Sequence, residues 1–328
     1  MNELYLRLVK EALEKLSIAS DGEHRFDDAS TVLFAEQLRQ IETTLYKTIY
    51  PNLRASEFVP FDTSVNKGAK QYGYYMLDKV GMAKLLTNGT TELEDVAVKI
   101  KRDFVNIEGE GIKYSWDIFE VYQAAYAGVP LTTEKADMAR LAIAEKTDDM
   151  AVRGETTAEM YGFTNHPSIS LVTPATGSWL AASGAVSATG LQMVEDIKLV
   201  INKTNKRSKK ALPVTNVVMP PSHLQALGQT IIASDGSNSQ TALSLLKGMF
   251  PGVTFEEYYE LDEADAAGTG PRIVAYHKSK MVLALPVPIV FEALPPQAIG
   301  IYFEVNCIGS VGSIVIRYPL AMSYMDGC

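Results

Sequence analysis

The sequence predicts a mixed α+β fold in which helices and strands follow one another without regular βαβ winding. Three observations support this prediction: two strand-like segments around an Asn-Gly turn, one long helix pattern, and short apolar strands near the end of the chain. The chain has 328 residues, of which 47% are hydrophobic and 21% are charged. This composition is ordinary for a packed globular protein, and no pattern repeats at the period of about 20 to 50 residues that a solenoid needs.

Two amphipathic helices are predicted near the N-terminus. Their apolar residues recur at helical spacing, and the polar break "SDGEHRFDD" separates them. The two apolar stripes are Leu6, Val9, Leu13 and Leu16, and Phe34, Leu38, Ile41 and Leu45. Neither helix has an obvious partner helix nearby in the sequence. An arm that lies on another part of the protein or on another subunit is therefore as plausible as a small bundle.

A long two-stranded ribbon is predicted from Gly68 onward. The segments "KQYGYYMLDKVGMAKLL" and "EDVAVKIKRDFVNI" are typical of strands, and Asn88-Gly89 between them is a strong turn signal. Because an isolated ribbon of this kind is marginal in water, we expect it to lie on another surface. The side chains suited to that contact are Tyr72, Tyr74, Tyr75, Met76, Val96, Val98 and Ile100.

Two helices are predicted next. The first runs from Asp117 to Ala127 and is stopped by Gly128. The second comes from "TTEKADMARLAIAEKTDDMAVRG", which has a threonine N-cap and a C-capping glycine, Gly154. At about 1.5 Å per residue this helix, residues 133–153, spans roughly 30 Å and is longer than a typical globular helix.

Helices and strands then alternate to the end of the chain. A helix pattern with Met193, Ile197 and Ile201 on one side precedes the strand "VTNVVM", a helix that opens at Pro221, and the helix "SQTALSLLKGMF". The closing stretch "GSIVIRYPLAMSYMDG" begins with β alternation and turns apolar again after a proline. A buried strand so late in the chain needs partners far back in the sequence, so we expect it to close a domain.

The residues that could carry chemistry do not form a convincing active site. His166 lies two residues from Ser168, with Asp148 and Asp149 nearby in sequence, but no G-x-S-x-G elbow is present and a tight turn explains the motif better. The other three histidines are far apart and have no metal-ligand spacing. The acidic segment "LDEADAAGTGPR" lacks the spacing of a calcium loop and of a phosphate-binding fingerprint. We expect no catalytic, cofactor or metal site.

Composition also limits the partners and the location. The apolar run "MVLALPVPIVF" is too short to span a membrane, and the charged N-terminus has no signal-peptide pattern, so we expect a soluble protein made in a cytoplasm. A net charge of −9 argues against a free nucleic-acid binder but allows a container with nucleic acid on one side. The basic run "KTNKRSKK" is better explained as a solvated helix end, and Cys307 and Cys328 as inert thiols.

Four segments, taken in order, resemble a known family. They are "VYQAAYAGVPL", "YGFTNHPSI", "VMPPSHLQAL" and the closing "FEALPPQAIGIYFEVNCIGSVGSIVIRYPLAMSYMDG". From about Phe58 to Gly327 the chain is similar to tailed-bacteriophage major capsid proteins of the HK97-like fold, and the "LPPQ…IRYP…DG" end is the most specific part. Residues 1–57 match nothing in that family.

The resemblance implies a division of the chain. It implies an arm over residues 1–60, an extended E-loop hairpin over 61–115, a peripheral domain with a spine helix over 116–211 and 297–328, and an axial domain over 212–296. In that family the arm and the E-loop reach onto neighbouring subunits. The stretch Gly312 to Pro319 would then return from the axial domain to complete the peripheral sheet.

The implied function is that of a structural shell protein, not an enzyme. It would assemble into hexamers and pentamers of an icosahedral head around packaged double-stranded DNA, bound on the inner face without sequence specificity. Scaffolding, portal and decoration proteins are further possible partners, and no membrane is involved. One alternative is the shell of an encapsulin-type compartment, which encloses enzymes. An alternative of another class is a hydrolase that uses His166 and Ser168.

Overall fold

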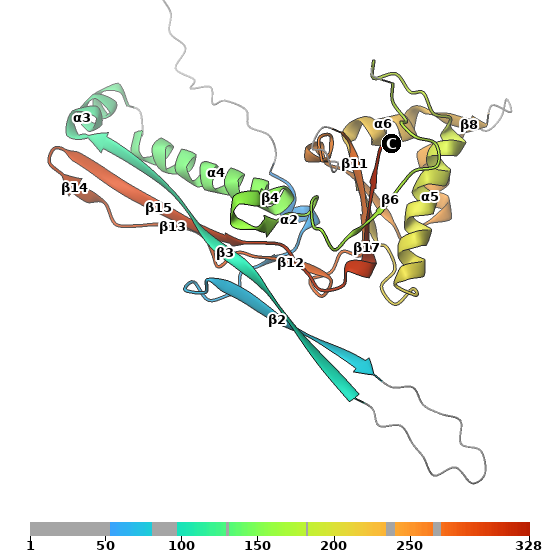
Figure 1. Cartoon of the computed structure of the whole chain (residues 1–328). Coiled ribbons are helices and arrows are strands. Elements are labelled where there is room, and N and C mark those ends of the chain that lie inside the picture. The colour runs from blue at the N-terminus through green and yellow to red at the C-terminus, as the bar shows by residue number, and fades with distance from the viewer. Residues whose placement is uncertain (1–52, 81–96, 129–130, 182, 234–239, 265–269) are drawn as a thin grey trace, which may run out of the picture. The chain divides into compact units, whose positions relative to one another are not determined.

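The computed structural model describes residues 53–80 and 97–328, apart from gaps at 129–130, 182, 234–239 and 265–269 (Figure 1). The two predicted N-terminal helices, the Asn88-Gly89 turn and Val96 therefore lie outside the described residues. The helices are α2 (Ala55–Phe58), α3 (Ile118–Ala127), α4 (Leu131–Val152), α5 (Gly190–Arg207), α6 (Pro221–Gln229) and α7 (Ala242–Met249).

The helix limits follow the capping residues. The carboxylate of Asp117 accepts a hydrogen bond from the backbone N–H of Phe119 at 3.4 Å at the start of α3, and Gly128 ends that helix with a φ of 72°. Helix α4 agrees with its prediction to within two residues at its start and one at its end. Gly154 follows it with a φ of 69°, the left-handed region that glycine enters without strain.

The strands form three larger sheets and two short pairs. Their bounds are β1 (Phe61–Asp62), β2 (Gln71–Val80), β3 (Ala97–Asp117), β4 (Gly154–Glu155), β5 (Met160–Tyr161), β6 (Ser170–Val172), β7 (Asn216–Met219), β8 (Ile231–Ala233), β9 (Gln240–Thr241), β10 (Thr254–Glu257), β11 (Arg272–Tyr276), β12 (Leu283–Pro286), β13 (Ile289–Ala293), β14 (Gln297–Ile299), β15 (Tyr302–Gly312), β16 (Val315–Ile316) and β17 (Met322–Asp326). The sheet orders are β13-β15-β3-β2, β10-β7-β11-β17-β6 and β1-β12-β16.

The long strand β3 joins the hairpin to the rest of the chain. Its first part pairs antiparallel with β2, and its second part, residues 107–117, pairs antiparallel with β15. The predicted strand ended at Ile107, so the strand is ten residues longer than expected. The signal that sequence reasoning missed is the alternation of Ile112, Tyr114 and Trp116 with polar residues. Tyr114 and Trp116, on the apolar face of this strand, pack under α4 around Ile143.

The second sheet is central to a large apolar core. Strand β17 lies between β11, antiparallel, and β6, parallel, and helix α5 packs its apolar side on this core. Met193, Ile197 and Ile201, the predicted inner face of that helix, are fully buried. Asp196 on the same helix is buried but accepts a hydrogen bond from the indole N–H of Trp179 at 3.0 Å.

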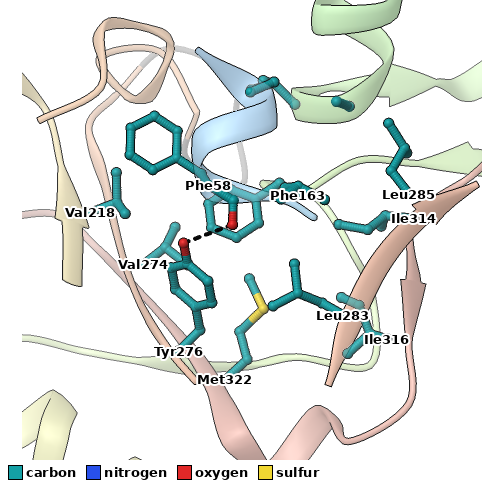
Figure 2. Close-up of a cluster of buried hydrophobic side chains, with 14 of the residues drawn as sticks. Phe58, Phe163, Val218, Val274, Tyr276, Leu283, Leu285, Ile314, Ile316 and Met322 are labelled. Atoms are coloured by element: carbon teal, nitrogen blue, oxygen red, sulfur yellow. Dashed lines mark hydrogen bonds between the residues drawn. The ribbon is translucent and has the colours of Figure 1, made fainter. Parts of the chain in front are cut away.

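The closing stretch differs from its prediction. Gly312 to Pro319 is not one strand of the sheet under α4: β15 ends at Gly312, β16 pairs with β12, and β17 enters the second sheet. The expectation of a single returning strand is wrong because β15, β16 and β17 pair with three different strands, β3, β12 and β11. Figure 2 shows the resulting core, in which Ile314 and Ile316 lie near Leu283 and the Tyr276 hydroxyl donates to the Phe58 carbonyl at 2.9 Å.

The domain limits stay a prediction. Residues 52–328 form one unit by their contacts, and the second sheet combines strands from both sides of residues 212 and 297. The hydrogen-bonding pattern alone therefore draws no boundary at these two positions.

Candidate assembly surface

The hairpin of β2 and β3 carries the predicted contact residues. Its register runs from Gln71 opposite Asn106 to Val80 opposite Ala97. Directly opposed residues of an antiparallel pair point to the same side, so each strand contributes alternate residues to two faces. The predicted contact residues lie on both faces, so the hairpin does not present them as one surface.

The outward face of the hairpin is aromatic and exposed. Tyr75 is 67% exposed, Phe104 62% and Ile100 61%. Phe104 lies opposite Gly73, and a Cβ at position 73 would come within 2.7 Å of the phenyl ring. The lack of a side chain at Gly73 therefore leaves room for the ring to lie across β2. The Arg102 guanidinium is 5.3 Å from the Tyr75 ring centroid. Sequence reasoning missed Phe104, although continuing the period of two beyond Ile100 finds it.

The opposite face turns toward the chain itself. Arg317 donates to the Tyr72 hydroxyl at 3.1 Å and to the Lys280 carbonyl at 2.6 Å, which ties the hairpin to the body of the protein. The Tyr74 hydroxyl donates to Asp103 at 3.4 Å. Burial, with the Asp103 carboxylate, raises the pKa of Tyr74. Tyr72, Tyr74 and Met76 are half-buried, whereas the side chain of Val98 lies outside the described residues.

A cleft of about 520 Å³ separates this face from the loop that holds His166 and Ser168. His166 Nδ1 accepts a hydrogen bond from the backbone N–H of Ser168 at 3.3 Å, and burial lowers the pKa of His166. Asp148 instead accepts from the backbone N–H of Ala55 at 2.8 Å and from the Tyr258 hydroxyl at 3.0 Å. The residues considered for a triad therefore belong to two different hydrogen-bond networks.

The base of the hairpin is fixed by polar contacts. Gln71 donates to the Asn106 side chain at 3.1 Å, and the Asn106 carbonyl accepts from the backbone N–H of Ser313 at 3.0 Å. Lys67 and Glu292 form an ion pair at 2.5 Å across the same junction. A second cleft of about 930 Å³ opens beside these residues, and Glu110 of β3 lies in its lining.

Glu110 is a carboxylic acid placed in the apolar row under α4. Its Oε2 accepts a hydrogen bond from the Thr147 hydroxyl at 3.4 Å, and its buried Oε1 has no partner among the described residues. Burial raises the pKa of Glu110 to about 7, while Thr147 and Lys146 act in the opposite direction and Asp149 adds to the rise. The contact between strand and helix therefore depends on the protonation of one side chain.

Raising the pH from about 5 to 8 should destabilise the protein through Glu110. The folded state holds this proton more tightly than the unfolded chain, so the stabilisation is complete below the ordinary pKa of 4.5 and is lost as the pH rises through about 7. Glu110→Gln should remove this dependence, whereas Glu108→Gln, at an exposed position two residues earlier on the same strand, should not. Urea unfolding midpoints at several pH values measure the effect. A difference in unfolding midpoint between wild type and Glu110→Gln that stays the same at every pH would contradict this prediction.

The remaining candidates are structural. Among the described residues, no group of three or more His, Cys, Asp or Glu side chains is arranged to hold a metal ion. None of the described helices combines the length and apolar character that crossing a membrane requires. Cys307 and Cys328 are buried as free thiols, and burial raises the pKa of both. A protonated, buried thiol is a poor nucleophile, which supports the interpretation of inert cysteines.

Known proteins resemble this chain in sequence family and in fold. A family model described as "Major capsid protein" matches residues 81–328. Among curated protein sequences, none matches.

Three solved structures illustrate the likeness in fold. The capsid of Myoviridae phage XM1 has a TM-score of 0.77 at 16% identity, over 91% of this chain and 100% of that one. The Mycobacterium phage Adephagia structure has a TM-score of 0.58 at 12% identity, over 86% and 91%. The capsid of an empty GTA particle has a TM-score of 0.57 at 12% identity, over 89% and 96%. These likenesses confirm the predicted HK97-like α+β fold.

Proposed function

The chain belongs to the major capsid protein family, and we propose on that premise that it builds the icosahedral head of a tailed bacteriophage. The observation that carries the proposal is the family match over residues 81–328, which includes β3, α4 and every strand of both five-stranded sheets except β2. The fold likeness to a Myoviridae phage capsid supports it. In this role the protein is a structural subunit with no catalysis of its own.

The subunits assemble as hexamers and pentamers, and the hairpin is the main reaching element. A two-stranded ribbon cannot bury the side chains of its own outward face, so Tyr75, Ile100 and Phe104 need another surface. The Arg317 contacts hold the opposite face, so the outward face is the one available to a neighbour. Each copy both gives and receives such a contact, and many modest contacts add up around a closed shell.

The other proposed partners follow from the same role. Double-stranded DNA is packaged inside the head and meets the inner face without sequence specificity. The net charge of −9 fits a container better than a protein that binds DNA freely. Scaffolding, portal and decoration proteins complete the virion, which is assembled in the cytoplasm of the bacterial host.

Expression of the full chain alone tests the proposal. We expect particles by sedimentation velocity, and rings of subunits with fivefold and sixfold symmetry by electron microscopy. An enzyme enclosed in those particles would instead favour the encapsulin-type compartment. A chain that stays in small species at high concentration, in conditions that preserve its helix content, would contradict the shell function. Hydrolase activity lost on joint alanine substitution of His166 and Ser168 would overturn the non-enzymatic role.

A further inference from the structure

Helix α5 and the connection between β11 and β12 carry a group of exposed lysines (Figure 1). The two segments are adjacent through residues 213–215, which closely follow the end of α5. The His277 Nδ1 atom donates to the Pro213 carbonyl at 2.6 Å, and the backbone N–H of Lys278 donates to the Thr215 hydroxyl at 2.9 Å. We name this group the lysine surface; its members are Lys198, Lys203, Lys206, Lys209, Lys210 and Lys278.

The lysine surface carries positive charge that the subunit itself does not balance. In the part of the chain that the structure describes, none of its six lysines lies in an ion pair with an acidic side chain. Several lysines elsewhere differ: Lys67, Lys113 and Lys135 are paired with glutamates at 2.5, 3.2 and 2.8 Å. The chain has 39 acidic residues against 30 Lys and Arg, so acidic partners are in excess. Unpaired cations gathered in one place of an acidic protein indicate an anionic partner.

The helix dipole accounts for only part of this arrangement. Cations stabilise the last turn of a helix, where Lys206 lies, but the effect is confined to that turn. Lys198 and Lys203 lie before the last turn, and Lys278 comes from another segment. Lys203 and Lys206 are three residues apart, a spacing at which like charges repel and destabilise a helix. A solvated helix end, which the sequence favoured, therefore explains only some of these lysines.

The turn after α5 holds two of the lysines in an unusual backbone conformation. Lys209 has a φ of 50° and Lys210 a φ of 59°, the left-handed region that glycine commonly occupies at a helix end. The turn is fixed by Asn205, whose carbonyl accepts from the backbone N–H of Lys210 at 2.8 Å and whose side chain accepts from that of Val214 at 2.9 Å. Because lysine is less favourable than glycine in this conformation, folding does not explain these two side chains.

The size and chemistry of the lysine surface fit the phosphate backbone of duplex DNA. A shallow cleft of about 330 Å³ along α5 is lined by Lys198, Lys203 and Lys206, with Glu195 at its N-terminal end. The rise from Lys198 to Lys206 is about 12 Å, a length over which duplex DNA carries about seven phosphates. Lysine meets phosphate as a point charge, and α5 contains no aromatic residue on which an unpaired base could stack.

We propose that the lysine surface binds the phosphate backbone of the packaged double-stranded DNA. The proposal rests on the proposed function and names the part of the subunit that meets the DNA. Such binding is independent of base sequence and depends strongly on salt, because each phosphate that a lysine neutralises releases condensed counterions. An acidic protein is a less suitable partner, because protein–protein interfaces are depleted in lysine. The side of the subunit that bears these lysines is then on the inner face of the shell.

Neutral substitutions in both segments test the proposal. Lys206→Gln with Lys278→Gln should leave circular dichroism unchanged, because both side chains are exposed. Filter binding of unassembled full-length subunits to a long linear duplex should show an affinity about tenfold lower at about 50 mM salt, and a slope of log affinity against log salt reduced by about two. The matched control is Lys70→Gln with Arg140→Gln, which removes the same charge at two other exposed positions. The control should change neither quantity.

The outcomes separate this proposal from the proposed function. If the wild type forms no particles, the shell function fails, whereas DNA binding by the subunits still tests the lysine surface. If the subunits do not bind the duplex, or if both double variants weaken binding equally, the assignment is overturned. Closed particles should not bind added duplex, because their inner face is hidden, and binding with the same salt slope would overturn the assignment to packaged DNA. Polyglutamate that binds more tightly than the duplex would also overturn it, in favour of an acidic protein.

Discussion

Replacing Tyr72–Val105 with an Asn-Gly turn is expected to abolish particle formation while the rest of the chain stays folded. Gln71 and Asn106 oppose each other in the hairpin, so a two-residue turn can close the shortened pair. None of the buried residues in the three apolar cores comes from the deleted segment. The free energy of unfolding should therefore change little, whereas the outward-facing aromatic side chains are lost.

Circular dichroism and sedimentation velocity on one sample measure both effects. Native helix content with only small species is the expected result. A variant that keeps the hairpin but carries Tyr75→Ser, Ile100→Thr and Phe104→Ser should also fail to assemble. Tyr72→Phe, which removes only the hydroxyl that accepts from Arg317, should assemble. Intact shells from the deletion would refute the role of the hairpin, and global unfolding would show that it belongs to the core of its own subunit.

Arg272→Met is expected to destabilise the folded subunit by about 3–5 kcal/mol, the cost of leaving a buried charge without its partner. The Arg272 side chain is 5% exposed, and its Nε and Nη2 atoms bind the two carboxylate oxygens of Asp326 at 2.6 and 2.5 Å. It also donates to the Thr164 carbonyl, and its guanidinium lies 4.5 Å from the Tyr324 ring centroid. The two residues oppose each other at the first position of β11 and the last position of β17, two neighbouring strands of the second sheet.

Urea unfolding of single and double variants measures this cost. Arg272→Met with Asp326→Leu should recover most of the stability, since removing both charges avoids the desolvation penalty. The matched control is Arg153→Met, because Arg153 pairs with Glu260 at 2.8 Å on the surface. That change should cost less than about 1 kcal/mol. Equal effects at the two sites would show that burial of the Arg272 pair does not matter.

The hairpin and the helices show which features of the fold could be predicted from the sequence. The limits of α3 and α4 were predictable because Asp117, Gly128 and Gly154 act within a few residues of the helix ends. The outer part of the hairpin was predictable because strand alternation is also local. Its two faces were not distinguished, because only the contacts of Arg317 with Tyr72 and Lys280 show which face turns inward.

By itself, the sequence determined the mixed fold class, the order of the hairpin, the helices α3 to α7 and the strand β7, and the capsid family that its motifs resemble. Tertiary structure alone decided that β3 continues to Asp117 beside β15, that the last residues divide between β16 and β17, and that Glu110 lies under α4 with one carboxylate oxygen bound to Thr147 and the other buried without a partner among the described residues. The physical reason is that caps and alternation act between near neighbours. Strand partners and burial depend on residues far apart in the chain, and their pairing is settled only when the whole subunit packs.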